Sequence, residues 1–235
     1  MKALDGLSFA VPEGSFLSLL GPSGCGKSTA LRMIAGLSRP SEGRIVWHGD
    51  DPIQSRDIGF VFQDATLMPW ATVYDNVRLP LRLKGSEGTG TSDRIMEALA
   101  LVGLESFARA YPRELSGGMR MRASIARAIV ARPRVLLLDE PFAALDEITR
   151  FRLNDDLLRL WQSFGWTVVF VTHSVFESVY LSQRLVVMTP RPGRVAATFE
   201  VPAAPRDAAF RTSAPYNAIC RDVTIALDRA MESAR

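Results

Sequence analysis

The feature that most constrains the fold is GPSGCGKS at residues 21–28, called here the phosphate loop. It matches the pattern G-x-x-x-x-G-K-[ST], whose glycines let backbone N–H groups turn inward around phosphate oxygens. The apolar run FLSLL precedes the loop, and ALRMIAGL follows it with the spacing of a short helix. An ordinary glycine-rich turn would rarely lie between an apolar strand and a helix in this way. We therefore expect an α/β fold built around a phosphate site.

The polar side chains of this loop have distinct expected roles. Lys27 would place a positive charge between the β- and γ-phosphates of a nucleotide, and Ser28 would offer its hydroxyl to Mg²⁺. Cys25 is expected to act as a small filler of the loop and not as a nucleophile. The nucleotide-binding residues expected from the motif are Gly21, Pro22, Ser23, Gly24, Cys25, Gly26, Lys27, Ser28 and Thr29.

Composition places the chain among ordinary globular proteins. It has 235 residues, of which 47% are hydrophobic and 23% are charged, and its net charge is +3. The basic residues are spread along the chain and interrupted by acids, so nucleic acid is not an expected ligand. Two cysteines are too few for a disulfide framework, which fits a reducing compartment.

Neither a membrane span nor a leader is predicted. No apolar run approaches the roughly 20 residues that cross a bilayer. The first residues, MKALDGLSFAVPEG, carry Asp5 and Glu13 and lack the apolar core of a signal peptide. We expect the chain in the cytosol unless a partner holds it at a membrane.

Hydrophobic patterning predicts buried strands that alternate with helices, hence a largely parallel, covered sheet. Residues 72–132 break this alternation because their pattern is helical throughout. We expect a core of about residues 1–71 and 133–202, a helical lobe of about 72–132 inserted into it, and a helical tail of about 205–235. Strands are predicted at 7–11, 16–20, 44–49, 58–63, 135–141, 167–173, 184–190 and 194–201.

Two acids follow the apolar strand VLLL, at Asp139 and Glu140. They emerge at the carboxyl end of the strand, where ligands of α/β sheets bind. Asp139 is the candidate to hold magnesium, and Glu140 is the candidate to accept a proton from attacking water. The competing interpretation is a pair of exposed acids at a strand end, which the nearby phosphate loop makes less favoured.

Two further polar residues end predicted strands at the same edge of the sheet. His173 follows TVVFVT, where its imidazole could bond a γ-phosphate, and the amide of Gln63 after IGFVF could contact both magnesium and water. Taken alone, either residue would more often have a structural role than a catalytic one. Four polar groups at the ends of three predicted strands favour a catalytic site.

A second candidate phosphate-binding site is LSGGMRMR, residues 115–122, where Ser116 and the glycines after it begin a helix. It lies on the helical lobe, far along the chain from the phosphate loop, so one nucleotide cannot easily contact both sites within one copy. Two copies packed head-to-tail would close each lobe on the nucleotide of the other core. Asp146 would lie along the same seam.

With these motifs in this order, the chain resembles the ATP-binding subunit of ABC transporters over about residues 4–200. The resemblance implies a P-loop NTPase (RecA-like) core with a mainly parallel sheet, an antiparallel β subdomain and an inserted α-helical subdomain. It also implies ATP and Mg²⁺ as cofactors, Glu140 as catalytic base and His173 as switch. Ser116, Gly117 and Gly118 would contact the ATP of the partner copy, and Asp146 would lie in the D-loop.

Within that family, GFVFQDATLMPWATVYDNV and VVMTPRPGR are similar to importers of the nitrate, sulfonate and taurine type. Closely similar subunits serve thiamine-precursor pyrimidines. The resemblance implies membrane permease partners, an indirect link to a periplasmic solute-binding protein, and a peripheral position on the cytoplasmic side of the inner membrane. Leu67, Met68, Pro69 and Trp70 are candidates to dock the permease, and packing of the lobe onto the core is an equal alternative.

Two departures from the family pattern stand out. Met121 occupies the usual place of a glutamine after the signature, so a polar bond across the dimer seam is expected to be lost. The usual upstream aromatic that stacks on adenine is missing, because Phe9 and Phe16 fall in strand patterns. We expect that the start of the chain is misplaced downstream; without base stacking, affinity would fall by roughly 1–3 kcal/mol.

Two other function classes remain open. A soluble ABC ATPase acting on chromosomes would carry long coiled coils between phosphate loop and signature, and no heptads are visible here. One that acts on ribosomes would carry two ATPase units in one chain. An ATP-binding regulator without turnover is disfavoured by the intact Glu140.

Overall fold

The structure is a computed structural model that describes residues 2–49, 53–202 and 205–232. The chain forms two compact units, each of which buries its own set of apolar side chains. The first unit comprises Met1–Val46, Leu138–Glu140 and Trp161–Arg235, and the second comprises Trp47–Leu137 and Pro141–Leu160. The predicted division into core, inserted lobe and tail stays a prediction.

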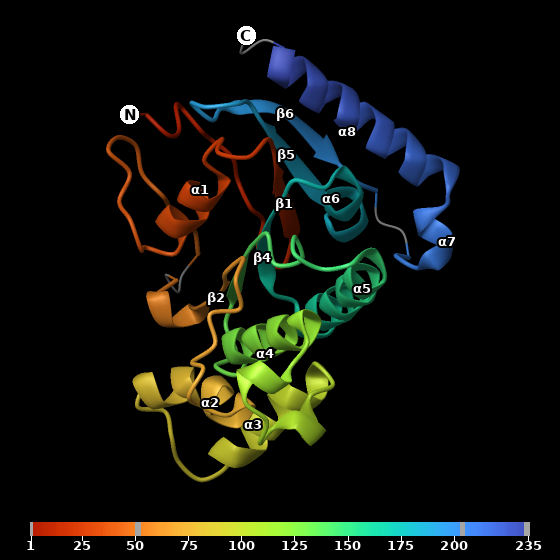
Figure 1. The fold of residues 1–235 in the computed structure, drawn as a ribbon. Coiled ribbons are helices and arrows are strands. Elements are labelled where there is room, and N and C mark those ends of the chain that lie inside the picture. Colours follow the sequence, from red (N-terminus) through yellow and green to blue (C-terminus); the bar gives the residue numbers. More distant parts are fainter. Residues whose placement is uncertain (1, 50–52, 203–204, 233–235) are drawn as a thin grey trace. The chain divides into compact units, whose positions relative to one another are not determined.

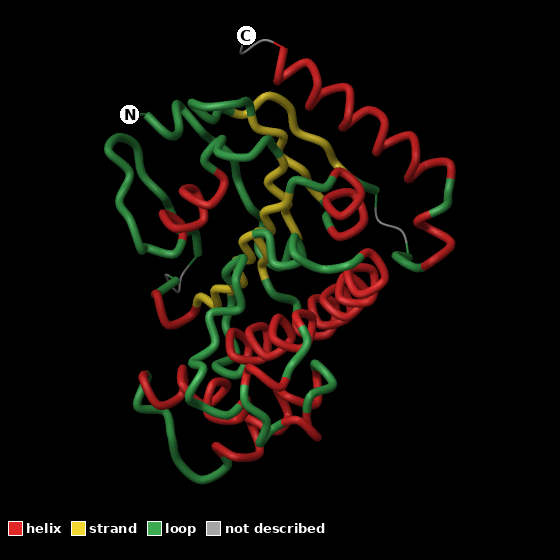
Figure 2. Tube along the Cα trace, viewed as in Figure 1, coloured by secondary structure: helices red, strands yellow, loops and turns green. Residues whose placement is uncertain are grey.

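The described strands form one mixed sheet in the order β2-β3-β4-β1-β5-β6 (Figures 1 and 2). Strand β1 is parallel to β4 and to β5, whereas β5 and β6 are antiparallel. The predicted α/β class with a mainly parallel sheet is confirmed, and its antiparallel part is the β5–β6 pair. The strands are β1 Phe16–Leu20, β2 Ile58–Val61, β3 Val135–Asp139, β4 Thr167–Thr172, β5 Arg184–Met188 and β6 Val195–Glu200.

The first unit is built on the strands β1, β4 and β5, which are buried along almost their whole length. All five residues of β1 are buried, as expected for a parallel strand covered on both faces. The ring of Phe16 lies 5.8 Å from that of Trp161 and 5.9 Å from that of Phe170. Edge strand β6 instead alternates half-buried and exposed residues. The helices of this unit are α1 Lys27–Ile34, α6 Val175–Leu181, α7 Ala208–Arg211 and α8 Ala214–Glu232.

The second unit is mainly helical, and the helical pattern predicted after residue 72 is confirmed. Helix α2 begins after Thr72, whose hydroxyl oxygen accepts a hydrogen bond of 3.1 Å from the N–H of Asp75. The helices are α2 Val73–Leu83, α3 Thr91–Leu101, α4 Gly117–Ile129 and α5 Glu147–Phe164, which begins in this unit. Short 3₁₀ turns are η1 Ser55–Asp57, η2 Glu105–Phe107 and η3 Pro112–Glu114.

Two of the predicted strands, at residues 7–11 and 44–49, are wrong. Residues 7–11 alternate half-buried and exposed positions, yet they join no ladder in the described chain. Ile45 and Val46 are 40% and 49% exposed. A β-strand needs a neighbour to receive its backbone hydrogen bonds. Alternation of apolar residues alone was therefore insufficient for a strand.

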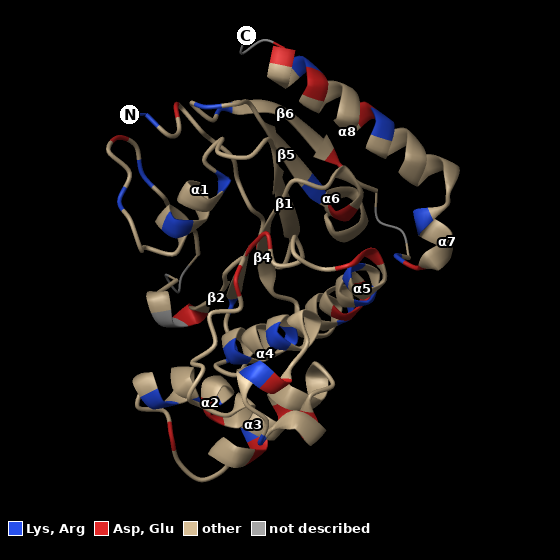
Figure 3. Cartoon of the chain, viewed as in Figure 1, with Lys and Arg blue, Asp and Glu red and all other residues tan. Residues whose placement is uncertain are grey.

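Charged side chains of both signs are interspersed along α5 and along α8 (Figure 3). Arg159 and Asp156 on α5 form an ion pair, and Arg221 on α8 lies 3.8 Å from the carboxylate of Asp222. Among the described helices, none is both long enough and apolar enough to cross a membrane.

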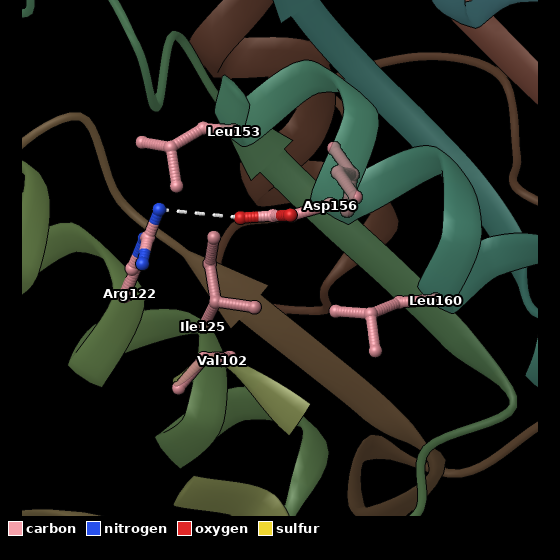
Figure 4. A pocket seen from close by; sticks show the side chains of 7 residues that line it. Val102, Arg122, Ile125, Leu153, Asp156 and Leu160 are labelled. Carbon is pink, nitrogen blue, oxygen red and sulfur yellow. Dashed lines mark ion pairs between the residues drawn. The ribbon is translucent and has the colours of Figure 1, made fainter. Parts of the chain in front are cut away.

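Helices α4 and α5 pack inside the second unit around a small apolar cavity (Figure 4). Arg122 of α4 and Asp156 of α5 form an ion pair of 3.3 Å between the two helices. Ile125 and Leu157 also line the cavity and are almost fully buried. The cavity is lined by Val102, Arg122, Ile125, Leu153, Asp156, Leu157 and Leu160.

We expect Leu157→Ala to lower the free energy of unfolding by about 2–5 kcal/mol, because it enlarges this cavity in a packed core. Leu157 is 1% exposed, whereas Leu83 of the same unit is 77% exposed. The matched control Leu83→Ala should change the free energy of unfolding by less than about 0.5 kcal/mol. Urea denaturation of the full chain measures both values. Equal effects of the two substitutions would contradict the packing of α4 on α5.

Candidate functional site

The phosphate loop runs from the end of β1 at Leu20 to the start of α1 at Lys27. Gly24 and Gly26 have φ of +78° and +107°, a region that residues with a Cβ rarely adopt. Gly26 is the N-cap of α1 and provides no side-chain cap. Because no N-cap side chain occupies this end of α1, its first N–H groups can bind an anion, which the helix dipole also favours.

Lys27 is the buried cation of this site, and its side chain is only 4% exposed. Its ammonium donates hydrogen bonds to the carbonyl oxygens of Gly21, at 2.8 Å, and Pro22, at 3.1 Å. It also lies 3.5 Å from a carboxylate oxygen of Glu140. A buried charge needs such partners, and phosphate oxygens are chemically suited to replace them.

Ser28 and Asp139 meet at the carboxyl end of the sheet. The Ser28 hydroxyl donates a hydrogen bond of 2.8 Å to Oδ1 of Asp139, the last residue of β3. The two oxygens suit Mg²⁺, which prefers oxygen ligands and usually takes few from the protein, keeping waters and binding substrate phosphates. No cluster of three or more potential metal-ligating His, Cys, Asp or Glu residues occurs in the described ranges.

Burial raises the pKa of Asp139, and the hydrogen bond from Ser28 partly opposes this effect. The side chain follows four buried residues of β3 and is itself only 6% exposed. Burial penalises the charged carboxylate, so a divalent cation beside it would be favourably placed.

Glu140 and His173 form a second polar pair next to Lys27. Oε2 of Glu140 lies 3.2 Å from Nδ1 of His173, whose side chain is 52% exposed. The backbone of Glu140 has φ of +46°, which is strained for a residue with a Cβ. Its N–H donates to the carbonyl oxygen of Val171, at 2.9 Å, which helps to hold this conformation. The carboxylate is held between His173 and Lys27 on a backbone that Val171 anchors.

The second unit contains the other predicted site residues. Gln63 is exposed and lies two residues beyond β2, which ends at Val61 and is shorter than the strand predicted to end at Gln63. Ser116 is exposed and is the N-cap of α4, where its Oγ accepts a hydrogen bond of 3.2 Å from the N–H of Met119. Its hydroxyl hydrogen can still be donated to an oxygen of a ligand.

Gly117 and Gly118 form the first turn of α4, and Gly118 is buried against Thr149 of α5. A Cβ added at Gly118 would lie 2.8 Å from the Cγ2 of Thr149, so this position requires glycine for space. Asp146 caps the start of α5: its Oδ1 accepts a hydrogen bond of 2.9 Å from the N–H of Thr149. Hydrogen bonds from Thr149 lower the pKa of Asp146.

Sequence reasoning missed the capping roles of Ser116 and Asp146. Serine and aspartate directly before a helical pattern are strong N-cap signals, so the information was present in the sequence. It also missed that the carbonyl oxygens of Gly21 and Pro22 hold Lys27, because no sequence signal marks a backbone acceptor.

The phosphate loop between a buried strand and a helix, with Asp139 and Glu140 at the end of the buried strand β3, defines a P-loop nucleotide-binding protein. The protein-family model described as ABC transporter matches residues 4–143. The chain belongs to the ABC transporter family, as its sequence motifs predicted. The ATP-binding proteins of this family hydrolyse ATP, and this chain is accordingly an ATPase.

The chain is similar to curated ATP-binding proteins of ABC transporters, among them import ATP-binding proteins. It is 48% identical over 202 residues to a taurine import ATP-binding protein of Rhizobium johnstonii, covering 86% of this chain and 77% of the relative. It is 43% identical over 201 residues to an aliphatic sulfonates import ATP-binding protein of Bacillus cereus, covering 85% and 79%. An uncharacterized ABC transporter ATP-binding protein of Methanocaldococcus jannaschii is 50% identical over 196 residues, 83% and 73% of the two chains.

Solved structures agree with the family. The dimeric structure of a bacterial ABC transporter cassette is 35% identical, covers 86% of this chain and 92% of that one, and superposes with a TM-score of 0.74. The same cassette was solved as a dimer in a post-hydrolysis state bound to ADP and Pi, with the same coverage and TM-score.

Proposed function

We propose that this ATPase powers a membrane permease for the uptake of a small organic or oxyanion solute, of the sulfonate, taurine or nitrate type. The observation that carries the proposal is the placement of Glu140 between Lys27, at 3.5 Å, and His173, at 3.2 Å, beside the phosphate loop. The names of the taurine and sulfonate relatives support the class of solute. The chain would work as a peripheral subunit on the cytoplasmic side of the inner membrane.

The predicted site residues of the first unit each have a role in this proposal. Backbone N–H groups of the phosphate loop bind the phosphates, and Lys27 exchanges its carbonyl partners for β- and γ-phosphate oxygens. Ser28 and Asp139 would hold Mg²⁺, which neutralises phosphate charge when bound. Glu140 accepts the proton of the attacking water, and His173 holds that carboxylate and bonds the γ-phosphate.

The residues of the second unit would serve the nucleotide of a partner copy. The exposed Ser116, with Gly117 and Gly118, presents the N-terminus of α4, which attracts anions. Gln63 would contact Mg²⁺ and the attacking water, and Asp146 would lie at the seam between the copies. The dimeric solved relatives support a homodimer, and we propose that its two copies pack head-to-tail and that it forms with ATP. In this view residues 72–132 form the lobe that closes on the partner.

The segment Leu67–Trp70 is proposed as the permease docking site. Trp70 is 77% exposed, which favours docking over packing as its role. The buried side chain of Asn76 fixes the segment, because its Oδ1 accepts from the N–H of Met68 at 2.7 Å and its Nδ2 donates to the carbonyl oxygen of Ala71 at 3.2 Å. An exposed tryptophan on a rigid loop is the kind of residue that dominates interface energies.

The test of the proposal is ATP hydrolysis by the full chain bound to its permease, with the permease embedded in lipid vesicles and the solute-binding protein added. We expect the permease to stimulate hydrolysis. Trp70→Ala should raise the permease concentration needed for half-maximal stimulation by about tenfold or more, because it removes about 1.4 kcal/mol or more of contact energy. Leu83→Ala is the matched control, because Leu83 is equally exposed at 77%.

Basal hydrolysis without permease should be the same in Trp70→Ala, Leu83→Ala and the natural chain. Absence of any stimulation by the permease would favour the alternative, a soluble ABC ATPase that is not coupled to transport. Stimulation that Trp70→Ala leaves unchanged would instead retain the coupling and remove Trp70 from the docking site.

A further inference from the structure

The turn between β5 and β6 lies against the phosphate loop, although the two segments are far apart in the sequence. In this turn Gly193 is buried between its exposed neighbours. Its N–H donates to the carbonyl oxygen of Ala3 at 2.9 Å, and its carbonyl oxygen accepts from the N–H of Asp5 at 3.0 Å. Leu4 and Gly193 thus form a parallel bridge between the N-terminal segment and the turn.

Gly193 packs so closely against the phosphate loop that a Cβ at this position would force neighbouring atoms to shift. A Cβ added there would overlap the carbonyl oxygen of Cys25 and would lie 2.9 Å from the Cε of Met188 and 3.1 Å from the Cδ2 of Leu4. The backbone of Gly193 does not have a positive φ. Space, and not backbone conformation, is therefore the reason for glycine at this position.

The same small cluster covers both ends of the phosphate loop. A Cβ at Gly26 would lie 2.5 Å from the Cδ2 of Leu4, and a Cβ at Gly21 would lie 3.1 Å from the Cβ of Met188. Leu4 and Met188 thus pack directly on the loop backbone. Movement of the turn or of the N-terminal segment would press on the loop, because interiors are close-packed.

The turn is itself held rigidly. The hydroxyl of Thr189 accepts from the N–H of Arg194 at 3.0 Å and donates to the carbonyl oxygen of Pro192 at 3.2 Å. Arg194 also pairs with Asp5 of the N-terminal segment. Arg191 donates to the carbonyl oxygen of Lys2 at 3.2 Å.

We propose that Gly193 is a positioning residue for the phosphate loop. The carbonyl of Cys25 faces Gly193, and in a planar trans peptide the N–H of the next residue points the opposite way. The contact with Gly193 therefore directs the N–H of Gly26 away from the turn and toward the phosphate side. This inference rests on the proposed role of the loop in ATP binding.

The test is Gly193→Ala in the full chain, assayed by steady-state ATP hydrolysis. We expect the KM for ATP to rise about tenfold to hundredfold, the loss expected when one charge-assisted hydrogen bond is removed. The kcat at saturating ATP should change little, because uniform binding is lost while Asp139 and Glu140 keep their places. The loop peptide that contains Cys25 should exchange its amide hydrogens faster.

Gly88→Ala is the matched control: Gly88 lacks a positive φ, and a Cβ there would meet nothing within 4 Å. It should leave KM unchanged. Leu4→Ala removes atoms instead of adding them, and should raise KM by a smaller factor. A folded Gly193→Ala with the natural KM, or Leu4→Ala with the natural KM where Gly193→Ala does not fold, would overturn the inference.

The parallel substitution Lys27→Ala separates this inference from the proposed function. If Lys27→Ala abolishes ATP binding while Gly193→Ala binds normally, only the role of Gly193 fails. If Lys27→Ala binds ATP normally, the phosphate loop is not the nucleotide site and both fail.

Discussion

Glu140→Gln is expected to reduce ATP hydrolysis by about 10²- to 10⁴-fold while ATP still binds, because the amide cannot accept the proton of the attacking water. The change keeps the shape of a side chain that lies 3.2 Å from His173 and 3.5 Å from Lys27. If two copies close on ATP, the unreactive nucleotide should also hold them together. Phosphate release measures turnover, and size-exclusion chromatography with ATP and Mg²⁺ measures the dimer.

The matched control is Glu200→Gln, which alters a 66% exposed carboxylate paired with Arg184 on the edge of the sheet. It should hydrolyse ATP at the natural rate, because exposed ion pairs contribute little. Hydrolysis by Glu140→Gln at a comparable rate would assign the base to another residue. Tight ATP binding with a strictly monomeric elution would contradict the dimer and would leave Ser116 without a ligand.

Lys27→Ala has the other large expected effect, a loss of ATP affinity of about hundredfold or more. The substitution removes a buried ammonium that the loop holds through two carbonyl oxygens, so the phosphates lose a charge-assisted donor. Calorimetric titration with ATP measures the affinity. The ATP-induced rise in the melting temperature gives a second measure, since a ligand stabilises only the state that binds it.

Two further variants sharpen this experiment. Lys27→Arg should also bind ATP weakly, because the larger guanidinium does not fit a site where the lysine is only 4% exposed. The control Lys84→Ala changes an exposed lysine at the end of α2 and should bind ATP normally. Natural affinity in Lys27→Ala would show that the nucleotide binds elsewhere.

Much of the fold was predictable because its signals are local. The buried strands around the phosphate loop, the helix that follows it and the helical stretch after residue 72 all depend on patterns within about ten residues. The strand-end positions of Asp139, Glu140 and His173 followed from the same patterns. The strands predicted at 7–11 and 44–49 failed because a pattern carries no information on whether a neighbouring strand is present.

The sequence by itself determined the phosphate loop, the apolar strands and the residue types that carry the chemistry, because short-range spacing and backbone preference decide these. Only the tertiary structure decided the partners: Ser28 with Asp139, Glu140 with His173, and Gly193 with Cys25. These contacts join residues far apart in the chain. They depend on how whole strands and turns pack, and no local rule connects one such position to another.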